Sequence, residues 1–176
     1  MRTDGHFRLA EKFVKQGSAR TIGFSSHTVP VALQAVRTGC FDVLMFPINP
    51  AFDALPGDTG TDDLGNLWNQ AYFHQAETET GGQIPPRKQL YAECVSRNIG
   101  LVAMKPFAAG WLFKPEINTG FTPLNLIHYA LSQPGVSCVI PGAANLAELE
   151  QDLRYFSAPG EEKDYSLAVS QSRWSF

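Results

Sequence analysis

FDVLMF, residues 41–46, is the stretch that decides the fold of this chain. Apart from Asp42 it is continuously apolar, which is typical of a strand buried on both faces, as in a parallel sheet. Two further runs of this kind, GLVAM at 100–104 and VSCVI at 136–140, follow along the chain, and the β-rich run TIGFSS precedes it at 21–26. We therefore expect four strands.

Helical patterns separate these strands. Apolar residues recur at helical spacing, and Pro, Thr or Asn stands at the expected starts. Asn145 with Glu148 three residues later is typical of a capping box. The helices are predicted over 6–16, 28–37, 86–98, from 122 and from 145. Their inward residues are predicted to be Phe7, Ala10, Phe13, Val14, Leu33, Val36, Leu90, Tyr91, Cys94, Val95, Leu124, Ile127, Leu131, Leu146, Leu149, Leu153 and Phe156.

Strands that alternate with helices predict an α/β fold with a parallel sheet and right-handed crossovers. A β/α barrel and a doubly wound open sheet both fit this order. In either architecture the functional residues lie at the carboxyl ends of the strands. The chain offers four such regions, at residues 25–27, 47–50, 105–110 and 141–145.

Composition narrows the class of protein. The 176 residues are 44% hydrophobic and 18% charged, with a net charge of −3, so no basic footprint for nucleic acid or an anionic membrane is present. No apolar run is long enough for a membrane span and the start of the chain has no signal-peptide core, so we expect a soluble, cytoplasmic chain. The scattered Cys40, Cys94 and Cys138 favour buried thiols over disulfides or zinc.

Residues 51–85 form a long insert after the second strand. Its first part is rich in turn residues and acidic. Residues 64–72 then carry an amphipathic pattern, which predicts a short helix over the mouth of the sheet. Asp58, Asp62 and Asp63 do not match a calcium loop, so we predict no metal there.

No self-contained catalytic motif occurs, and neither a G-x-G-x-x-G nor a P-loop is present. The candidates are therefore polar residues at strand ends. Ser25 and Ser26 offer hydroxyls for a ligand amide, but capping of the following turn explains them equally well. His27 is more often merely solvated in such a turn, and Asn49 before Pro50 is as consistent with a turn.

Two loops have the composition of anion sites. Lys105 is followed by PFAAG at 106–110, where small residues let backbone N–H groups approach a phosphate. The alternative is a lysine that extends to solvent. The segment PGAAN at 141–145 precedes a helix N-terminus, where N–H groups are unpaired. A tight turn needs the same small residues.

The strand ends together carry a resemblance. Residues 19–27, 41–50, 100–107 and 131–143 resemble, in order, the fifth to eighth barrel strands of aldo-keto reductases. The resemblance implies a partial (β/α)8 TIM barrel of about four βα units with a preceding helix, over residues 1–157. The tail, 158–176, is similar to that of a clade with an iron–sulfur, ferredoxin-like extension. We expect a cluster only if such an extension follows.

The family binds a nicotinamide dinucleotide and reduces carbonyls by hydride transfer. Its catalytic residues lie in the first four strand units, so the resemblance assigns no catalytic residue and no metal ligand here. We therefore expect the cofactor-side half of an NAD(P)-dependent oxidoreductase, a fragment inactive alone. The residues carried over as cofactor-binding are Ser25, Ser26, Lys105, Pro106, Phe107, Gly142, Ala143, Ala144, Glu148, Gln151 and Asp152.

The same resemblance bears on the choice between NAD(H) and NADP(H). NADPH-preferring members often have Lys or Arg at the positions of Gly142 and Glu148. A 2′-phosphate beside Glu148 meets like charge, so NAD(H) is favoured. The rival hypotheses are a non-catalytic dinucleotide-binding module, a half-barrel that self-associates through open sheet edges, and a degenerate remnant.

Overall fold

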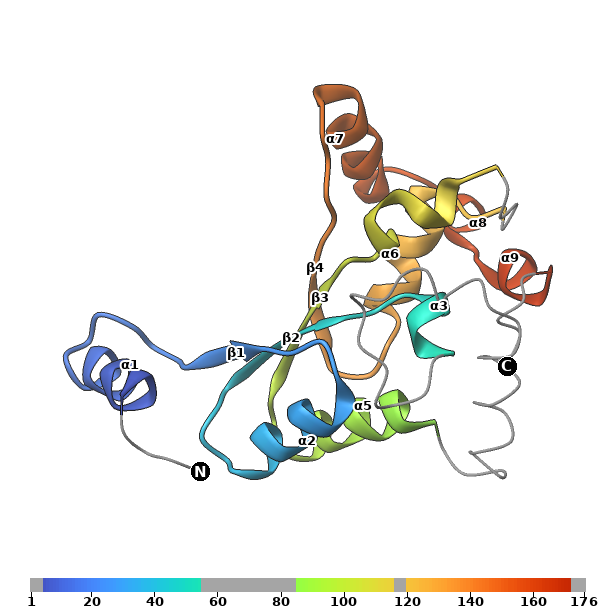
Figure 1. Ribbon diagram of the computed structural model, residues 1–176. Coiled ribbons are helices and arrows are strands. Elements are labelled where there is room, and N and C mark those ends of the chain that lie inside the picture. The colour runs from blue at the N-terminus through green and yellow to red at the C-terminus, as the bar shows by residue number, and fades with distance from the viewer. Residues whose placement is uncertain (1–4, 55–84, 116–119, 172–176) are drawn as a thin grey trace.

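The computed structural model describes residues 5–54, 85–115 and 120–171 (Figure 1). In these ranges, parallel strands form one sheet in the order β1-β2-β3-β4. Each strand therefore lies beside its neighbour in the chain, as in a barrel, whereas a doubly wound sheet reverses its order at a switch point. The strands are β1 (Gly23–Ser25), β2 (Val43–Pro47), β3 (Gly100–Met104) and β4 (Val136–Ile140).

The helices alternate with these strands as the sequence predicts. Those that connect the strands begin and end within a few residues of the predicted bounds. The helices are α1 (His6–Lys15), α2 (Val29–Arg37), α3 (Pro50–Asp53), α5 (Pro86–Ser96), η2 (Ala108–Phe113), α6 (Pro123–Leu131), α7 (Leu146–Leu153), η3 (Arg154–Phe156), α8 (Gly160–Lys163) and α9 (Ser166–Gln171).

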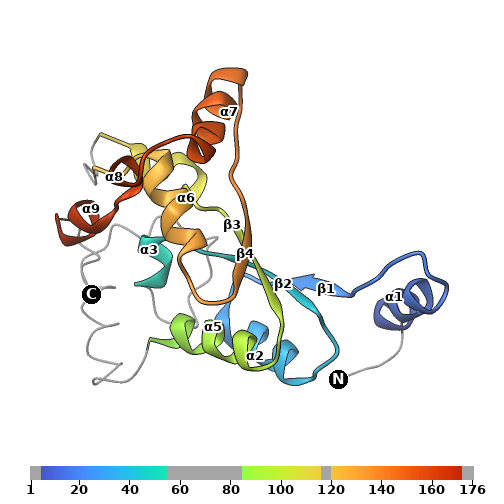
Figure 2. The same cartoon turned by 180° about the vertical axis from the view of Figure 1, so that it is seen from behind.

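One face of the sheet carries the core. Leu44 and Phe46 of β2 and Leu101 and Ala103 of β3 are fully buried against α2, α5 and α6. The two views of the ribbon place α2 and α5 together along this side (Figures 1 and 2). Because side chains alternate between the two faces along a strand, these residues all point to the face that the helices cover. A second cluster around Phe52 joins α3, η2, α6 and α9.

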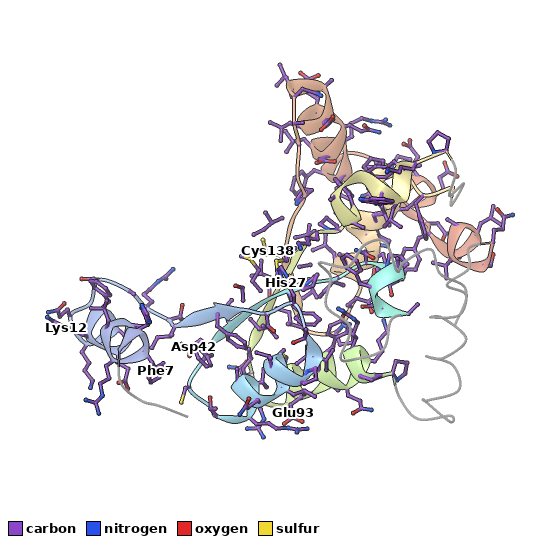
Figure 3. All side chains as sticks on the ribbon, in the orientation of Figure 1. Phe7, Lys12, His27, Asp42, Glu93 and Cys138 are labelled. Carbon is purple, nitrogen blue, oxygen red and sulfur yellow. The ribbon has the colours of Figure 1, made fainter. Side chains whose placement is uncertain are left out.

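The opposite face of the sheet is largely uncovered, so the prediction of strands buried on both faces was wrong for the described chain. Met45 and Val102 are only half-buried, and Ile140 is 47% exposed. Cys138 lies in the same strand as Ile140 and is exposed (Figure 3), so the prediction that all three thiols are buried was also wrong. Only Cys94 is buried. Burial raises the pKa of its thiol to about 11.

Helix starts follow the predicted chemistry, with one difference. The Thr122 hydroxyl accepts from the N–H of Asn125, whose side chain accepts from Thr122 N–H, which completes a capping box. Asn145 caps α7 by accepting from Glu148 N–H. Glu148, however, reaches back to the N–H of Ala144 and not to that of Asn145.

Several residues predicted to face inward do not. α1 buries none of its residues, because it lies beside β1 and not over the core. It is attached by an aromatic chain in which Phe41 packs between Phe7 and Phe24. Val95 is exposed on α5. The stripe predicted on the last helix, Leu146, Leu149, Leu153 and Phe156, is exposed because no element of the described chain covers this side of α7 and η3.

The predicted insert helix at 64–72 and the acidic positions 58, 62 and 63 lie outside the described residues, as does the end of the tail. The described part of the tail packs on α6. Asn125 donates through its side-chain amide to the carbonyls of Glu162 and Asp164, at 3.1 and 2.9 Å. Tyr165 then stacks edge-on against Tyr129.

A buried polar cluster ties α3 to α5 and α6. The Asp53 carboxylate, 1% exposed, accepts from the hydroxyls of Tyr91 and Tyr129 at 2.6 and 2.7 Å and from Lys88 Nζ at 3.2 Å. Burial and the nearby Asp53 charge raise the pKa of Tyr91 and Tyr129 well above the ordinary value. Both phenols therefore stay protonated as donors. The cluster was not predicted from the sequence.

Arg87 is fully buried in the same region. Its Nη1 donates to the carbonyl of Pro47 at 3.1 Å, and its guanidinium lies 5.0 Å from the ring centroid of Phe46. Desolvation lowers its pKa below the ordinary value. The arginine thus fixes the end of β2 against α5 through one hydrogen bond and stacking.

Replacement of Asp53 by alanine tests the cluster. Asp53→Ala leaves the buried hydroxyls of Tyr91 and Tyr129 without their acceptor and removes the ion pair with Lys88. We therefore expect the free energy of unfolding to fall by about 3–5 kcal/mol in urea titrations. Glu93→Ala, which removes only the surface ion pairs with Arg37 and Arg97, is the control, with a change below about 1 kcal/mol. Equal effects of the two substitutions would contradict the assignment.

Candidate functional site

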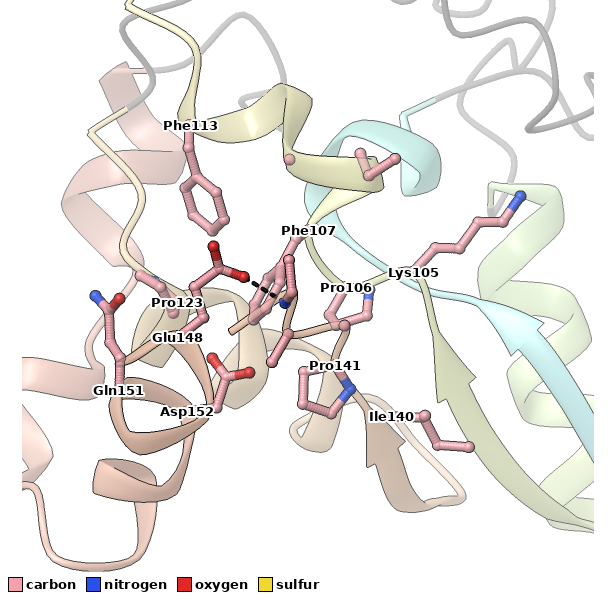
Figure 4. Close-up of a pocket in the computed structure, with 16 residues that line it drawn as sticks. Lys105, Pro106, Phe107, Phe113, Pro123, Ile140, Pro141, Glu148, Gln151 and Asp152 are labelled. Atoms are coloured by element: carbon pink, nitrogen blue, oxygen red, sulfur yellow. Dashed lines mark hydrogen bonds between the residues drawn. The ribbon is translucent and has the colours of Figure 1, made fainter. Parts of the chain in front are cut away.

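A pocket opens where the loops after β3 and β4 meet the first turns of α7 (Figure 4). Its volume of about 980 Å³ suits a large small-molecule ligand. Its position at the carboxyl ends of parallel strands is where such sheets bind ligands. The lining residues are Lys105, Pro106, Phe107, Ala108, Ala109, Gly110, Phe113, Pro123, Ile140, Pro141, Gly142, Ala143, Ala144, Glu148, Gln151 and Asp152.

The loop after β3 has an unusual backbone. Lys105, Ala108 and Ala109 have φ values of 53°, 48° and 55°, and Gly110 follows at 82°. Left-handed backbone is disfavoured for residues with a Cβ, and such residues cluster at functional sites. The strain is therefore concentrated in the wall of the pocket.

Asn49 holds this loop in place from the neighbouring strand end. Its Nδ2 donates to the carbonyl of Lys105 at 2.9 Å, and its Oδ1 accepts from Phe52 N–H at 2.9 Å, which caps α3. The side chain is fully buried. The amide thus resolves the open choice between a turn residue and a site residue: Asn49 begins a helix and positions the pocket loop.

The other wall is the N-terminus of α7, and it is already occupied by a carboxylate. Glu148 Oε2 accepts from the N–H of Ala144 at 2.7 Å, and Oε1 accepts from Asn145 Nδ2 at 2.9 Å. A helix N-terminus attracts anions because its N–H groups are unpaired. Here the chain supplies that anion itself, so the predicted anion site at 141–145 is partly filled.

Asp152 lies one turn further along α7, beside Glu148 in the pocket (Figure 4). It is only 7% exposed, and its Oδ2 is buried without a hydrogen-bond partner. Desolvation, and then the Glu148 charge, raise the pKa of this carboxyl. A buried oxygen without a donor is costly. The ionised form of this carboxyl is therefore destabilising in the folded chain.

The pocket separates charge along its length. Lys105 lies at the β3 end, and Glu148, Gln151 and Asp152 lie at the α7 end (Figure 4). The ring of Phe107 lies between them, and its centroid is 5.2 Å from that of Phe113. The carboxyl groups and the lysine of the pocket lining therefore lie at opposite ends, and the Lys105 side chain extends away from the other lining residues (Figure 4).

The structure brings most of the predicted site residues together. Nine of the eleven line this pocket: Lys105, Pro106, Phe107, Gly142, Ala143, Ala144, Glu148, Gln151 and Asp152. Ser25 and Ser26 do not, because β2 lies between β1 and β3. The Ser26 hydroxyl instead donates to the carbonyl of Thr28 and accepts from its N–H. That is the turn-capping role that the sequence left open.

Sequence reasoning missed several members of the site. Ala108, Ala109 and Gly110 were recognised as a small-residue loop, but their left-handed backbone has no signal in the sequence apart from the glycine. Phe113 and Pro123 reach the pocket from segments that follow the loop. Asn49 was weighed as a site residue or a turn residue, but its hydrogen bond to the Lys105 loop was not predicted.

The described residues place no group of three or more His, Cys, Asp or Glu side chains where they could hold a metal ion. Within the same ranges, every helix is too short or too polar to cross a membrane.

Substitution of Asn49 tests its link to the loop. Asn49→Ala removes the α3 cap, worth about 1 kcal/mol, and leaves the Lys105 carbonyl without its donor, which costs about 1–3 kcal/mol more. Asn49→Ser keeps a capping oxygen but is too short to reach Lys105. We expect the free energy of unfolding from urea titrations to fall for both, and further for alanine. Wild-type stability in either variant would contradict the link.

The raised pKa of Asp152 predicts the direction in which the stability of the folded chain changes with pH. The folded chain holds this proton more tightly than the unfolded chain, so ionisation costs stability as pH rises from the ordinary carboxyl pKa to the raised one. Below that window the cost is absent. Asp152→Asn has no proton to lose, so we expect its melting temperature to equal the wild type in acid and to exceed it at neutral pH. A constant difference across the pH range would contradict this.

The comparisons with known proteins bear on the fold. No family model and no curated protein matches the chain. Among solved structures, it is similar to a thermostable aldo-keto reductase crystallised with the inhibitor epalrestat, at 18% sequence identity and a TM-score of 0.54. The match covers 93% of this chain and 53% of that one, so the chain spans about half of its neighbour's length. The fold of this chain is therefore that of a partial β/α barrel.

Proposed function

We propose that this chain is the cofactor-binding side of an NAD(P)-dependent oxidoreductase of the aldo-keto reductase type, and that its pocket binds a nicotinamide dinucleotide. The observation that carries the proposal is the gathering of residues 105–107, 142–144, 148, 151 and 152 in one pocket. These segments are the ones whose resemblance to the family implies contact with the cofactor. They come from loops far apart in the sequence.

The residues present fit such a ligand. A dinucleotide has a dianionic pyrophosphate in its middle and donor groups on its adenosine end. Lys105 supplies the positive charge, and the left-handed loop at 108–110 exposes backbone to the ligand. Asp152 lines the α7 end of the pocket, where the proposal places the adenosine. When bound, the dinucleotide would supply the hydride for carbonyl reduction.

NAD(H) is the preferred form in this proposal. Glu148 already accepts from Ala144 N–H at the α7 N-terminus. A 2′-phosphate there has to displace this carboxylate or lie beside it, and Asp152 adds a second carboxyl nearby. A ribose hydroxyl, by contrast, can donate to a carboxylate. The repulsion between like charges disfavours NADP(H), and the hydrogen bond from the ribose hydroxyl favours NAD(H).

The proposal gives this chain no catalytic residue. His27 lies at the β1 end, outside the pocket lining, and Lys105 is assigned to the cofactor. We therefore expect dinucleotide binding without carbonyl reduction by this chain alone. A small carbonyl substrate, a cytoplasmic location and an iron–sulfur extension remain predictions. A second candidate, a non-catalytic binding module, is favoured by the same pocket and differs only in the absence of any reaction.

Fluorescence titration of the chain with NADH and NADPH tests the proposal. We expect NADH to bind at least about tenfold more tightly, because a desolvated like-charge contact costs more than 1 kcal/mol. Glu148→Arg should narrow or reverse the ratio. Glu161→Arg makes the same charge change on α8, outside the pocket, and should leave the ratio unchanged.

The outcomes separate two claims. Failure of both nucleotides to bind would overturn the proposed function. Tighter binding of NADPH to the wild type would leave dinucleotide binding in place and overturn only the preference for NAD(H).

A further inference from the structure

The sheet ends in two edges. In the described chain, β1 pairs only with β2 and β4 pairs only with β3. The outer N–H and C=O groups of both edge strands are therefore available for a further strand, which is a liability unless they are covered. Both edge strands run parallel to their neighbours in the sheet, so a further strand can be added to each in the same direction.

The uncovered face of the sheet is apolar. Met45, Val102 and Met104 lie on it in neighbouring strands, with Cys138 and Ile140 beside them in β4. The register aligns Met45 with Val102, and Val102 with Cys138, so the side chains form rows across the sheet. In a closed barrel such rows fill the interior.

The helices at the two edges have opposite charge. α1 lies beside β1 and carries the exposed cations Arg8, Lys12 and Lys15 against the single carboxylate of Glu11. Figure 3 shows Lys12 at the outer end of the molecule. α7 follows β4, and its exposed charged residues, Glu148 and Glu150, are both acidic. The two helices lie at opposite ends of the sheet (Figures 1 and 2).

Both helices also carry exposed apolar residues. Leu9 and Phe13 are one turn apart on α1, and both are about half exposed. Leu146, Leu149 and Leu153 recur at helical spacing on α7 and are exposed as well. Residues three or four apart share a helix face. Each edge of the sheet therefore presents an uncovered apolar stripe next to charges, and the charges are of opposite sign at the two edges.

We propose that two copies of this chain close into one eight-stranded barrel about a two-fold axis parallel to the strands. Such an axis keeps all strands parallel, pairs β4 of one copy with β1 of its partner at both seams, and places α7 beside the partner's α1. The two open faces then become the barrel interior. Two-fold dimers are the commonest oligomers, and closure leaves no free edge.

A second copy is the occupant that the charges favour. The basic helix and the acidic helix belong to the same chain, and each lies at the edge where the other is required. A head-to-tail contact of this kind forms an open filament unless the rotation that relates neighbouring copies closes a ring. Because each copy supplies half of a barrel, two copies close the ring.

Sedimentation velocity on the full chain, over a concentration series, tests the proposal. We expect a species of twice the 19.3 kDa chain mass. Leu149→Lys places a cation against the basic helix of the partner and should raise the dissociation constant at least about tenfold. Leu167→Lys, at a residue 67% exposed on α9, makes the same change away from both edges and should leave it unchanged.

Charge reversal gives a second test. Chains with Lys12→Glu and Lys15→Glu, or with Glu148→Lys and Glu150→Lys, should each dimerise more weakly than the wild type. An equimolar mixture of the two should recover the dimer, because the reversed α1 then faces the reversed α7 at one seam and the wild-type helices face each other at the other. A monomer at all concentrations would overturn the proposal and leave the open face to a different chain. Growth beyond the dimer, or insensitivity to Leu149→Lys, would also overturn it.

Discussion

The crossovers of a parallel sheet impose the constraint on which the rest of this structure depends. A right-handed connection between neighbouring parallel strands places every helix on the same side of the sheet. In this chain α2, α5 and α6 cover Leu44, Phe46 and Leu101 completely, while Met45 and Ile140 on the other face remain accessible. The same constraint brings the carboxyl ends of β3 and β4 side by side, which creates the pocket. The core, the open face and the site thus follow from one rule of chain connection.

The sequence predicted the parts of the fold that have a local signal. The apolar runs of β3 and β4 begin and end as predicted. Thr122 and Asn145 cap helices because a short polar side chain can accept a hydrogen bond from a free N–H group at a helix start. Burial was predicted less well, because an apolar stripe in the sequence indicates that a helix has an apolar side but not whether another element covers it. On α7 that side carries Leu149, which nothing in the described chain covers. Periodicity cannot tell a covered stripe from an uncovered one.

The candidate site shows the same division. The resemblance of the strand ends predicted the loops that line the pocket, but not the contacts that hold them. Asn49 and Asp53 bond to residues more than 30 positions away, so no spacing in the sequence reveals them. Ser26 illustrates the reverse case, because its hydroxyl bonds within two residues, and the local alternative of a capped turn is the one the structure shows.

In the proposed complex, an anionic ligand shares the pocket with two carboxyl groups. Glu148 accepts from Ala144 N–H and Asn145 Nδ2, so the α7 N-terminus partly balances its charge. Asp152 has no such donor for its Oδ2, and desolvation raises its pKa. An apolar residue of similar size would avoid this cost. Because Lys105 lies at the other end of the pocket, the proposal assigns phosphate recognition to the β3 end and neutral donor groups of the ligand to the α7 end.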